Sequence, residues 1–264
     1  MQRNLIHNES CLDTMANFVD GSIDMVITSP PYDNMRDYKG YSFPFENIAK
    51  ELARVLAPGG IIVWIVNDQT HNGSESLSSF KQAIYFKDEC GLNAHDTMIW
   101  AKKSASMPSS NRYDQITEYM FILSKGKPKT VNLIRDKPNK WAGKTTFSKT
   151  NSIRQPDGSM QDKQIQGKYA EFGNRYNVWN HNTSAQENPC KKQFHPATFP
   201  LQLIKDHILT WSNKGDIVYD PFMGSGTTAK ACIETSRDYI GSEISLEYTK
   251  SAIKDLQTMT PPLF

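Results

Sequence analysis

The sequence of 264 residues lacks the patterns that identify several large classes of protein. No segment approaches the roughly 20 consecutive apolar residues that a membrane-spanning helix requires, and the first ten residues contain no continuous apolar stretch. Its four cysteines are far apart and form no CxxC pair, so the usual sequence signal for a zinc or redox centre is missing. We therefore expect an intracellular protein whose thiols stay free in a reducing compartment.

Two further absences restrict the chemistry. The six histidines show no HExxH or similar spacing, so we expect no metal cofactor. A glycine-rich turn at residues 220–228 is not followed by Gly-Lys-Ser or Gly-Lys-Thr, and Ala229 stands where a GxGxxG motif has its third glycine. The turn is therefore neither a P-loop nor a complete dinucleotide-binding fingerprint.

The sequence does have a strongly uneven distribution of charge. The formal charge of residues 1–100 is −6, that of residues 101–194 is +10 and that of residues 195–264 is −2, although the whole chain carries only +2. A block this basic is typical of a nucleic-acid-binding surface, because Lys and Arg neutralise phosphates and release counterions. Charge alone leaves open the alternative of a solvated basic surface without a partner.

The first hundred residues predict alternating strands and helices. An apolar run at residues 22–27 is typical of a buried strand, and it ends before two prolines that cannot donate to a sheet. Apolar residues in 45–56 recur at helical spacing up to the helix-ending Pro58-Gly59-Gly60, and the apolar run 61–66 predicts another buried strand. Strand, helix and strand in this order favour an α/β fold with a mostly parallel sheet.

The middle of the chain is polar, and regular patterns return only near Phe199. Within residues 102–192 only Tyr119–Leu123 is strand-like. After Phe199 we expect a helix to about Leu209, a strand at 216–220, an Ala-rich helix and a short strand at 239–243. We therefore divide the chain into three parts. These are residues 1–100, the basic residues 101–194 and residues 195–264.

The first candidate motif is the turn Asp220-Pro-Phe-Met-Gly-Ser-Gly-Thr-Thr between a predicted strand and helix. Open α/β sheets bind nucleotides at such turns, beyond the carboxyl ends of their strands. Gly224 and Gly226 would allow a ligand to approach closely, and the helix amides after Gly226 can meet a ligand carboxylate. Glu243, at the end of the next strand, can accept both hydroxyls of a ribose. Glycines that merely form a tight turn are the alternative for this motif alone.

The second candidate motif is Thr28-Ser29-Pro30-Pro31-Tyr32. Its prolines remove two N–H donors, so nearby carbonyls are left as acceptors. An exocyclic amine needs such acceptors: the Ser29 hydroxyl and the Pro30 carbonyl can bind its two protons and orient the nitrogen lone pair, while Tyr32 stacks on the ring. A strand that simply ends in a proline-rich turn would explain this motif equally well if it stood alone.

Together, with the proline motif preceding the glycine-rich turn, the two motifs resemble those of the β class of DNA amino-methyltransferases of restriction–modification systems. Residues 111–125, 177–179 and 195–200 are similar to further landmarks of that family. The resemblance implies a Rossmann-like methyltransferase fold of a mostly parallel, twisted sheet flanked by helices, with the basic target-recognition lobe inserted in the middle of the chain. It also implies S-adenosylmethionine (SAM) as cofactor without a metal. Residues 1–100 would then be the catalytic half of the methyltransferase domain, residues 101–194 the target-recognition region and residues 195–264 the cofactor-binding half.

The resemblance assigns roles to individual residues. The implied catalytic residues are Ser29, Pro30, Pro31 and Tyr32. The segment 195–200 resembles the one that closes over the methionine end of the cofactor, and Glu9-Ser10 stands where the family has a Gly-Asp pair near the cofactor adenine. The implied cofactor-binding residues are Ser10, Phe199, Asp220, Phe222, Gly224, Ser225, Gly226, Thr227 and Glu243.

The same resemblance predicts the substrate and the setting. The predicted substrate is double-stranded DNA, from which the target base is flipped out. The enzyme is expected in the cytoplasm, as a prokaryotic or a phage-encoded protein. A restriction endonuclease that acts separately is a candidate partner. Family members with Thr-Ser-Pro-Pro-Tyr more often methylate cytosine N4, whereas Asp in place of Ser29 is more common for adenine N6. We predict cytosine N4, with adenine N6 as the alternative. Two hypotheses outside this pair stay open, namely an enzyme of the same chemistry that acts on RNA or a protein amide, and a DNA-binding module without activity.

Overall fold

The computed structural model describes residues 2–31, 43–103, 111–144, 151–163, 167–182 and 199–259. These residues form two compact units. The larger unit comprises residues 1–132 and 177–264, and the smaller comprises residues 133–176. Nothing in the described ranges is a helix both long and apolar enough to cross a membrane.

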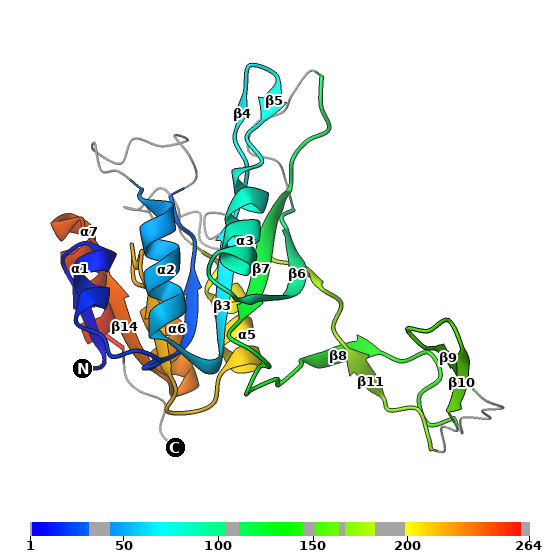
Figure 1. The fold of residues 1–264 in the computed structure, drawn as a ribbon. Helices are drawn as coiled ribbons and strands as arrows, with labels where there is room; N and C mark the ends of the chain where they lie inside the picture. Colours follow the sequence, from blue (N-terminus) through cyan, green and yellow to red (C-terminus); the bar gives the residue numbers. More distant parts are fainter. Residues whose placement is uncertain are drawn as a thin grey trace. The chain divides into compact units, whose positions relative to one another are not determined.

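An eight-stranded sheet organises the larger unit (Figure 1). Its strand order is β1-β14-β13-β2-β3-β7-β6-β12, and every neighbouring pair is parallel except the two that involve β7. The predicted mostly parallel α/β fold is therefore confirmed. The strands are β1 (Leu5–His7), β2 (Ile23–Thr28), β3 (Leu56–Val66), β6 (Asn93–Ala101), β7 (Thr117–Ser124), β12 (Val178–Asn180), β13 (Ile217–Asp220) and β14 (Asp238–Ser242).

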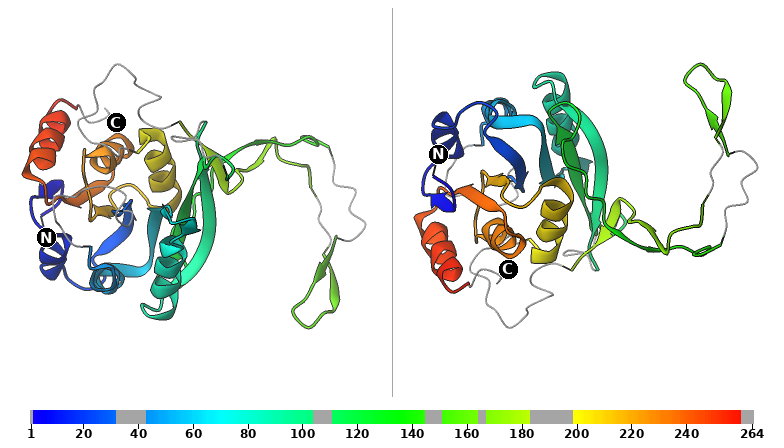
Figure 2. Two further views of the ribbon diagram at one scale, coloured as in Figure 1. Left: turned by 90° about the horizontal axis from the view of Figure 1, so that it is seen from above. Right: turned by 90° about the horizontal axis from the view of Figure 1, so that it is seen from below.

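Helices cover both faces of this sheet (Figure 2). On one face α1 packs beside α2 and α2 beside α3, while on the other face α5 packs against α6. Burial of the strands on both sides explains why β2 and β3 have nearly continuous apolar runs instead of alternating ones. The helices are α1 (Cys11–Ala16), α2 (Phe45–Val55), α3 (Ser78–Asp88), α5 (Leu201–Trp211), α6 (Thr227–Thr235) and α7 (Leu246–Gln257).

The junction between α2 and β3 differs from the sequence prediction. The helix ends at Val55, and the strand begins at Leu56, so that Pro58-Gly59-Gly60 lies inside the strand that was predicted to start at residue 61. A Cβ atom at Gly60 would lie 2.9 Å from the carbonyl oxygens of Ala57 and Asp24. Glycine is therefore required here by the close approach of β2 and β3, beside an irregularity in their register.

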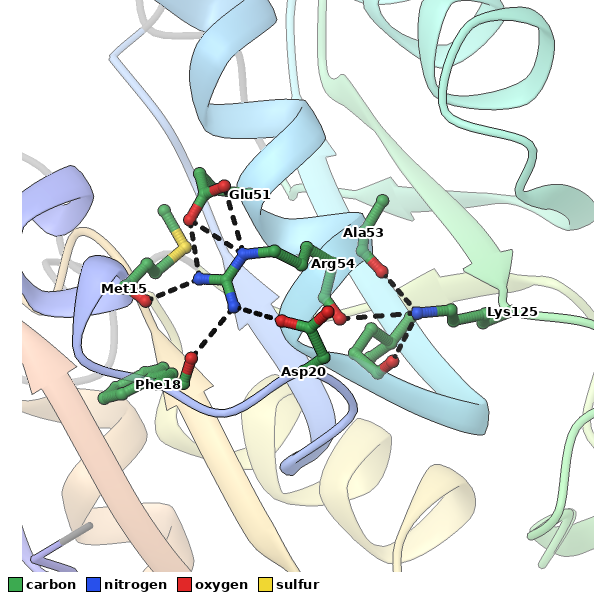
Figure 3. A network of polar contacts seen from close by, with 8 residues as sticks. Met15, Phe18, Asp20, Glu51, Ala53, Arg54 and Lys125 are labelled. Carbon is green, nitrogen blue, oxygen red and sulfur yellow. Dashed lines mark hydrogen bonds and ion pairs between the residues drawn. The ribbon is translucent and has the colours of Figure 1, made fainter.

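Two cationic side chains, Arg54 and Lys125, form hydrogen bonds around the carboxyl end of α2 (Figure 3). The Arg54 guanidinium donates to the backbone oxygens of Met15 (2.7 Å) and Phe18 (2.9 Å), and also binds the carboxylates of Asp20 and Glu51. Lys125 Nζ donates to backbone oxygens at the end of the helix, including that of Ala53 at 2.7 Å. Positive charge at a helix carboxyl end offsets the partial negative charge of the unpaired carbonyls.

Short antiparallel ribbons make up the rest of the described strands. In the smaller unit, β8 (Arg135–Pro138) pairs with β11 (Phe172–Asn174), and β9 (Asn151–Arg154) pairs with β10 (Met160–Lys163). In the larger unit, β4 (Thr70–His71) and β5 (Ser74–Glu75) form a hairpin after β3.

Candidate active site

The carboxyl ends of parallel strands bring the two sequence motifs to one edge of the sheet. β2 leads into Ser29, β13 leads into the glycine-rich turn, and β13 lies directly between β2 and β14. Loops that follow neighbouring parallel strands converge in this way, so a ligand at this edge can contact several of them. The two motifs are nearly two hundred residues apart in the sequence, and the pairing of β2 with β13 brings them close together in space.

The turn after β13 has the backbone conformation that its glycines allow. Gly224 and Gly226 both have positive φ angles, 53° and 80°. Gly226 is the N-cap of α6, and no side chain supplies a capping hydrogen bond there. The first amide groups of a helix are donors without a partner inside the helix, and together with the helix dipole they favour an anion. A carboxylate-bearing ligand suits this position.

Glu243 lies at the opposite side of the turn, directly after β14. Its side chain is buried, with Oε2 accepting the Gly224 N–H at 2.9 Å and Oε1 accepting the Ser245 N–H at 2.8 Å. Burial is the main cause that raises the pKa of this carboxyl above its ordinary value. An ionised carboxylate has about four acceptor sites, so two backbone donors leave capacity for a pair of ligand hydroxyls. A ribose has two neighbouring hydroxyls that can donate to this carboxylate.

A contact beneath the turn was not recognised from the sequence. A Cβ atom at Gly241 would lie 2.4 Å from the terminal methyl of Met223 and 2.9 Å from its Cγ. Met223 is buried, and its backbone N–H donates to the Ser242 oxygen at 2.9 Å. Gly241 therefore leaves the space in which the turn packs on β14. The glycine in Tyr239-Ile-Gly-Ser-Glu was the available signal for this close approach.

The described part of the proline motif begins where β2 ends. Thr28 is fully buried, Pro30 is buried, and Ser29 and Pro31 are half-buried. The Thr28 hydroxyl donates to Asp220 Oδ1 at 2.7 Å, which joins the proline motif to the start of the glycine-rich turn. Tyr32 lies outside the described residues.

The remaining predicted residues lie around the same loops. Ser10 is the N-cap of α1 and accepts the Leu12 N–H at 3.3 Å, so its hydroxyl already has a role in the fold. The Phe222 ring contacts the Phe43 ring, with 5.7 Å between their centroids. Ser225 Oγ and Thr227 Oγ1 are 3.3 Å apart in the turn. Phe199, half-buried, comes just before α5, whereas His195 lies outside the described ranges.

The contacts of two polar residues at this edge, Asn8 and Thr228, were not predicted from the sequence. Asn8, after β1, donates from Nδ2 to the Glu243 backbone oxygen at 2.8 Å and so ties the edge strand to the end of β14. The Thr228 hydroxyl, in α6, donates to Asp220 Oδ2 at 2.6 Å. Asn8 has no distinctive sequence pattern, because its partner follows another strand. Thr228 stands in the glycine-rich motif, but the sequence did not show that its hydroxyl binds Asp220.

Comparison with known proteins decides the family. A sequence profile of the N6/N4 DNA methylases matches residues 23–254. The chain belongs to this DNA methylase family. Its relative M.BamHII, an orphan methyltransferase of Bacillus amyloliquefaciens, is 53% identical over 243 residues, which cover 91% of each chain. This DNA methylase is thus a site-specific, SAM-dependent amino-methyltransferase of the restriction–modification type, which confirms the family predicted from its motifs.

Solved structures of other methyltransferases resemble this DNA methylase throughout. The cytosine-N4-specific PvuII DNA methyltransferase has a TM-score of 0.68 at 19% identity, with coverage of 100% of this chain and 89% of that chain. This likeness confirms the methyltransferase fold. The complex of M1.HpyAVI with SAM has a TM-score of 0.60 at 25% identity, with coverage of 95% of this chain and 98% of that one.

Proposed function

We propose that this DNA methylase transfers the methyl group to the N4 amine of a cytosine that is flipped out of DNA. The observation that carries the proposal is the meeting of Ser29-Pro30-Pro31 with the glycine-rich turn at one sheet edge, linked by the 2.7 Å hydrogen bond from Thr28 to Asp220. One motif has the acceptors for an amine, and the other has the donors and the carboxylate for a nucleoside-bearing ligand. Their proximity matches a reaction between the two.

In this proposal the proline motif orients the amine. The Ser29 hydroxyl and the Pro30 carbonyl accept its two protons, which directs the nitrogen lone pair toward the cofactor. The neighbouring prolines have no N–H group to compete for these acceptors. Tyr32 is proposed, from the sequence, to stack on the base. Positioning and a water-poor site then account for the rate, and the proton lost from the amine passes to solvent.

The glycine-rich turn and its surroundings are proposed to hold the cofactor. When bound, SAM supplies a methyl group on a positively charged sulfur. Glu243 accepts the ribose hydroxyls, and the amides that open α6 bind the methionine carboxylate. We assign the walls of the site to the other side chains predicted to touch the cofactor, which are Ser10, Phe199, Phe222, Ser225 and Thr227.

The choice of base rests on the motif itself. Ser29 as the first residue of the tetrapeptide favours cytosine N4, whereas family members that methylate adenine N6 more often have Asp there. The family includes enzymes of both kinds, as its name N6/N4 states. Adenine N6 is therefore the alternative target.

The basic region 101–194 is proposed to recognise the DNA. The smaller unit, residues 133–176, lies within this region of the sequence. Residues 133–176 hold nine Lys and Arg but four Asp and Glu. Exposed aromatic rings stand beside these cations: Lys144 Nζ lies 4.6 Å from the Trp141 ring centroid, and Lys137 Nζ lies 4.3 Å from that of Tyr176. Cations for phosphates and flat rings for bases are the two components of nucleic-acid surfaces.

The experiment that tests the function is expression in a bacterial host without DNA methylation, followed by single-molecule sequencing that detects modified bases. N4-methylcytosine within one short motif supports the proposal, and the motif shows which restriction endonuclease the modification would block. N6-methyladenine would overturn the choice of base. If the host DNA stays unmodified although the protein binds the cofactor, the protein is an inactive DNA-binding module or acts on another substrate.

A further inference from the structure

Asp220 connects the end of β2 with both sides of the glycine-rich turn. Its Oδ1 accepts the Thr28 hydroxyl (2.7 Å) and the Phe222 N–H (3.0 Å), and its Oδ2 accepts the Thr228 hydroxyl (2.6 Å). Thr28 directly precedes Ser29, whereas Phe222 and Thr228 stand on either side of the two glycines of the turn. One carboxylate therefore contacts the chain segments that carry the two halves of the reaction.

The surroundings of Asp220 make this connection rigid. The residue is 2% exposed and Thr28 is 0% exposed, so neither side chain faces a ligand. Burial raises the pKa of the Asp220 carboxyl, and the three hydrogen bonds oppose this shift by stabilising its charged form. Loss of one donor would leave an acceptor position of the buried carboxylate without a hydrogen bond, which destabilises the folded protein. Each of the three donors is therefore held strongly in place.

A second contact brings the same two segments together. The Phe43 ring, which lies just before α2 on the chain that follows the proline motif, packs edge-on against the Phe222 ring. Phe222 is also the residue whose N–H is bound by Asp220. The turn is therefore held to the first residue of the proline motif, Thr28, by the hydrogen bond to Asp220, and to the segment after the motif by an aromatic contact.

We propose that Asp220, which the family resemblance implied to be a cofactor-binding residue, is instead a positioning residue. It sets the distance between the amine acceptors at Ser29 and Pro30 and the cofactor turn, and it contacts neither cofactor nor base. This inference rests on the proposed function of the two motifs. Transfer between two bound groups depends steeply on their alignment, and a displacement of about 1 Å can cost roughly 100-fold in rate. A carboxylate that holds both loops is placed to control that alignment.

Two threonines provide a matched test, because each donates one hydroxyl to the same carboxylate from a different side. Thr28→Val removes the bond to the proline motif, and Thr228→Val removes a bond to the turn, with little change of shape in either case. We expect Thr28→Val to lower kcat at saturating cofactor and DNA at least about tenfold, the loss expected for one charge-assisted bond. Its calorimetric Kd for S-adenosylhomocysteine should stay within about twofold.

The Thr228 variant should show the opposite pattern. Its Kd for S-adenosylhomocysteine should rise at least about fivefold, because the turn that binds the cofactor loses its support. Thr28→Ser and Thr228→Ser, which keep the hydroxyl, should restore kcat and Kd respectively. Thermal unfolding of all four variants shows whether the effects follow stability, and Thr28→Ala replaces Thr28→Val if the valine variant does not fold.

The outcomes separate this inference from the proposed function. An active wild-type enzyme whose folded Thr28→Val variant keeps its kcat would overturn the positioning role. The same holds if both valine variants change kcat and Kd in proportion to their loss of thermal stability, since Asp220 would then be a purely structural group. A wild-type protein that modifies no DNA would instead refute the proposed function.

Discussion

Glu243 Oε2 accepts a hydrogen bond from the backbone N–H of Gly224 at 2.9 Å, so the carboxylate at the end of β14 is held against the glycine-rich turn. The same contact is made in a buried environment that raises the pKa of the carboxyl above 4.5. Glu243 therefore loses its charge at a higher pH than an exposed glutamate does.

We expect cofactor affinity to fall on acidification, and to fall at a higher pH than it would for a carboxyl of ordinary pKa. Ribose hydroxyls donate to an ionised carboxylate, so binding lowers the pKa of Glu243 and is opposed by protonation. At pH values below the pKa that Glu243 has in the free protein, the Kd for the cofactor should rise about tenfold per pH unit. Calorimetry with S-adenosylhomocysteine across pH measures this dependence.

Two variants show whether Glu243 is responsible. Glu243→Gln should bind weakly, with a Kd that no longer depends on pH in this range. Asp238→Asn changes another carboxylate at the opposite end of β14, one that is paired with Arg3, and should keep the wild-type pH profile. A pH dependence that persists in Glu243→Gln would assign it to a different group.

Loss of the Ser29 hydroxyl should affect turnover and not cofactor binding. Ser29→Ala removes a proposed acceptor of the target amine, and we expect kcat to fall about 10- to 100-fold, as for the loss of one positioned polar group. Tyr32→Ala should also lose most of its turnover, since it is proposed to hold the base. Calorimetry of both variants with S-adenosylhomocysteine should give wild-type Kd values, and an equal loss of cofactor binding would refute the assigned roles.

A methyl group at Gly241 should disturb the turn through Met223. Gly241→Ala places its Cβ 2.4 Å from the end of the Met223 side chain, and overpacking of this kind costs roughly 1 to 3 kcal/mol. We expect weaker binding of S-adenosylhomocysteine, measured by calorimetry. The double variant Gly241→Ala/Met223→Ala should recover part of the affinity because it removes the two nearest atoms, Cε and Cγ, and leaves only the Met223 Cβ at 3.0 Å. Met223→Ala alone is the control. Absence of recovery would mean that the backbone, and not Met223, limits this position.

The smaller unit should contribute to DNA affinity through both charge and stacking. Lys144→Gln should lower the slope of log K against log salt by about 0.9 if Lys144 neutralises one phosphate. Trp141→Ala should weaken binding by roughly 1 to 3 kcal/mol at unchanged slope if the ring stacks on a base. Fluorescence anisotropy with a DNA duplex at several salt concentrations measures both. Lys254→Gln near the end of α7 is the control, and equal effects in all three variants would contradict a specific role.

Arg54 should matter more for stability than other surface arginines. Arg54→Met removes the guanidinium that donates to the backbone oxygens of Met15 and Phe18, of which the Met15 oxygen keeps a backbone donor, the Phe18 N–H. We expect a loss of about 1 to 3 kcal/mol in the free energy of unfolding, because these hydrogen bonds come from a charged group. The control Arg3→Met removes an exposed ion pair with Asp238, for which about 0.5 kcal/mol or less is expected. Urea unfolding of both variants measures the difference, and similar losses would show that the Arg54 contacts contribute no more than an exposed pair.

The amino-acid sequence by itself determined the local features of this protein. Continuous apolar runs identified β2 and β3 as buried strands, helical spacing identified α2, and glycines and prolines identified the two loops that form the site. These signals are readable because periodicity and backbone restrictions operate over a few neighbouring residues. The order of the two motifs then indicated the family.

Several strands had no such signal. The first five residues of β6, from Asn93 to Thr97, are exposed, so the strand lacks the apolar pattern that marks its neighbour β7. β12 has three residues and is defined by its parallel pairing with β6, not by its own composition. Exposed and very short strands carry little hydrophobic periodicity, which is why neither β6 nor β12 was predicted.

Only the tertiary structure decided how the site is held together. Thr28 and Asp220 are separated by 192 positions, and their hydrogen bond exists because β2 and β13 are adjacent in the sheet. The space that Gly241 leaves for Met223 and the raised pKa of Glu243 likewise depend on neighbours from other segments. Burial, and the hydrogen bonds that compensate for it, are properties of the packed chain, so no local pattern of residues encodes them.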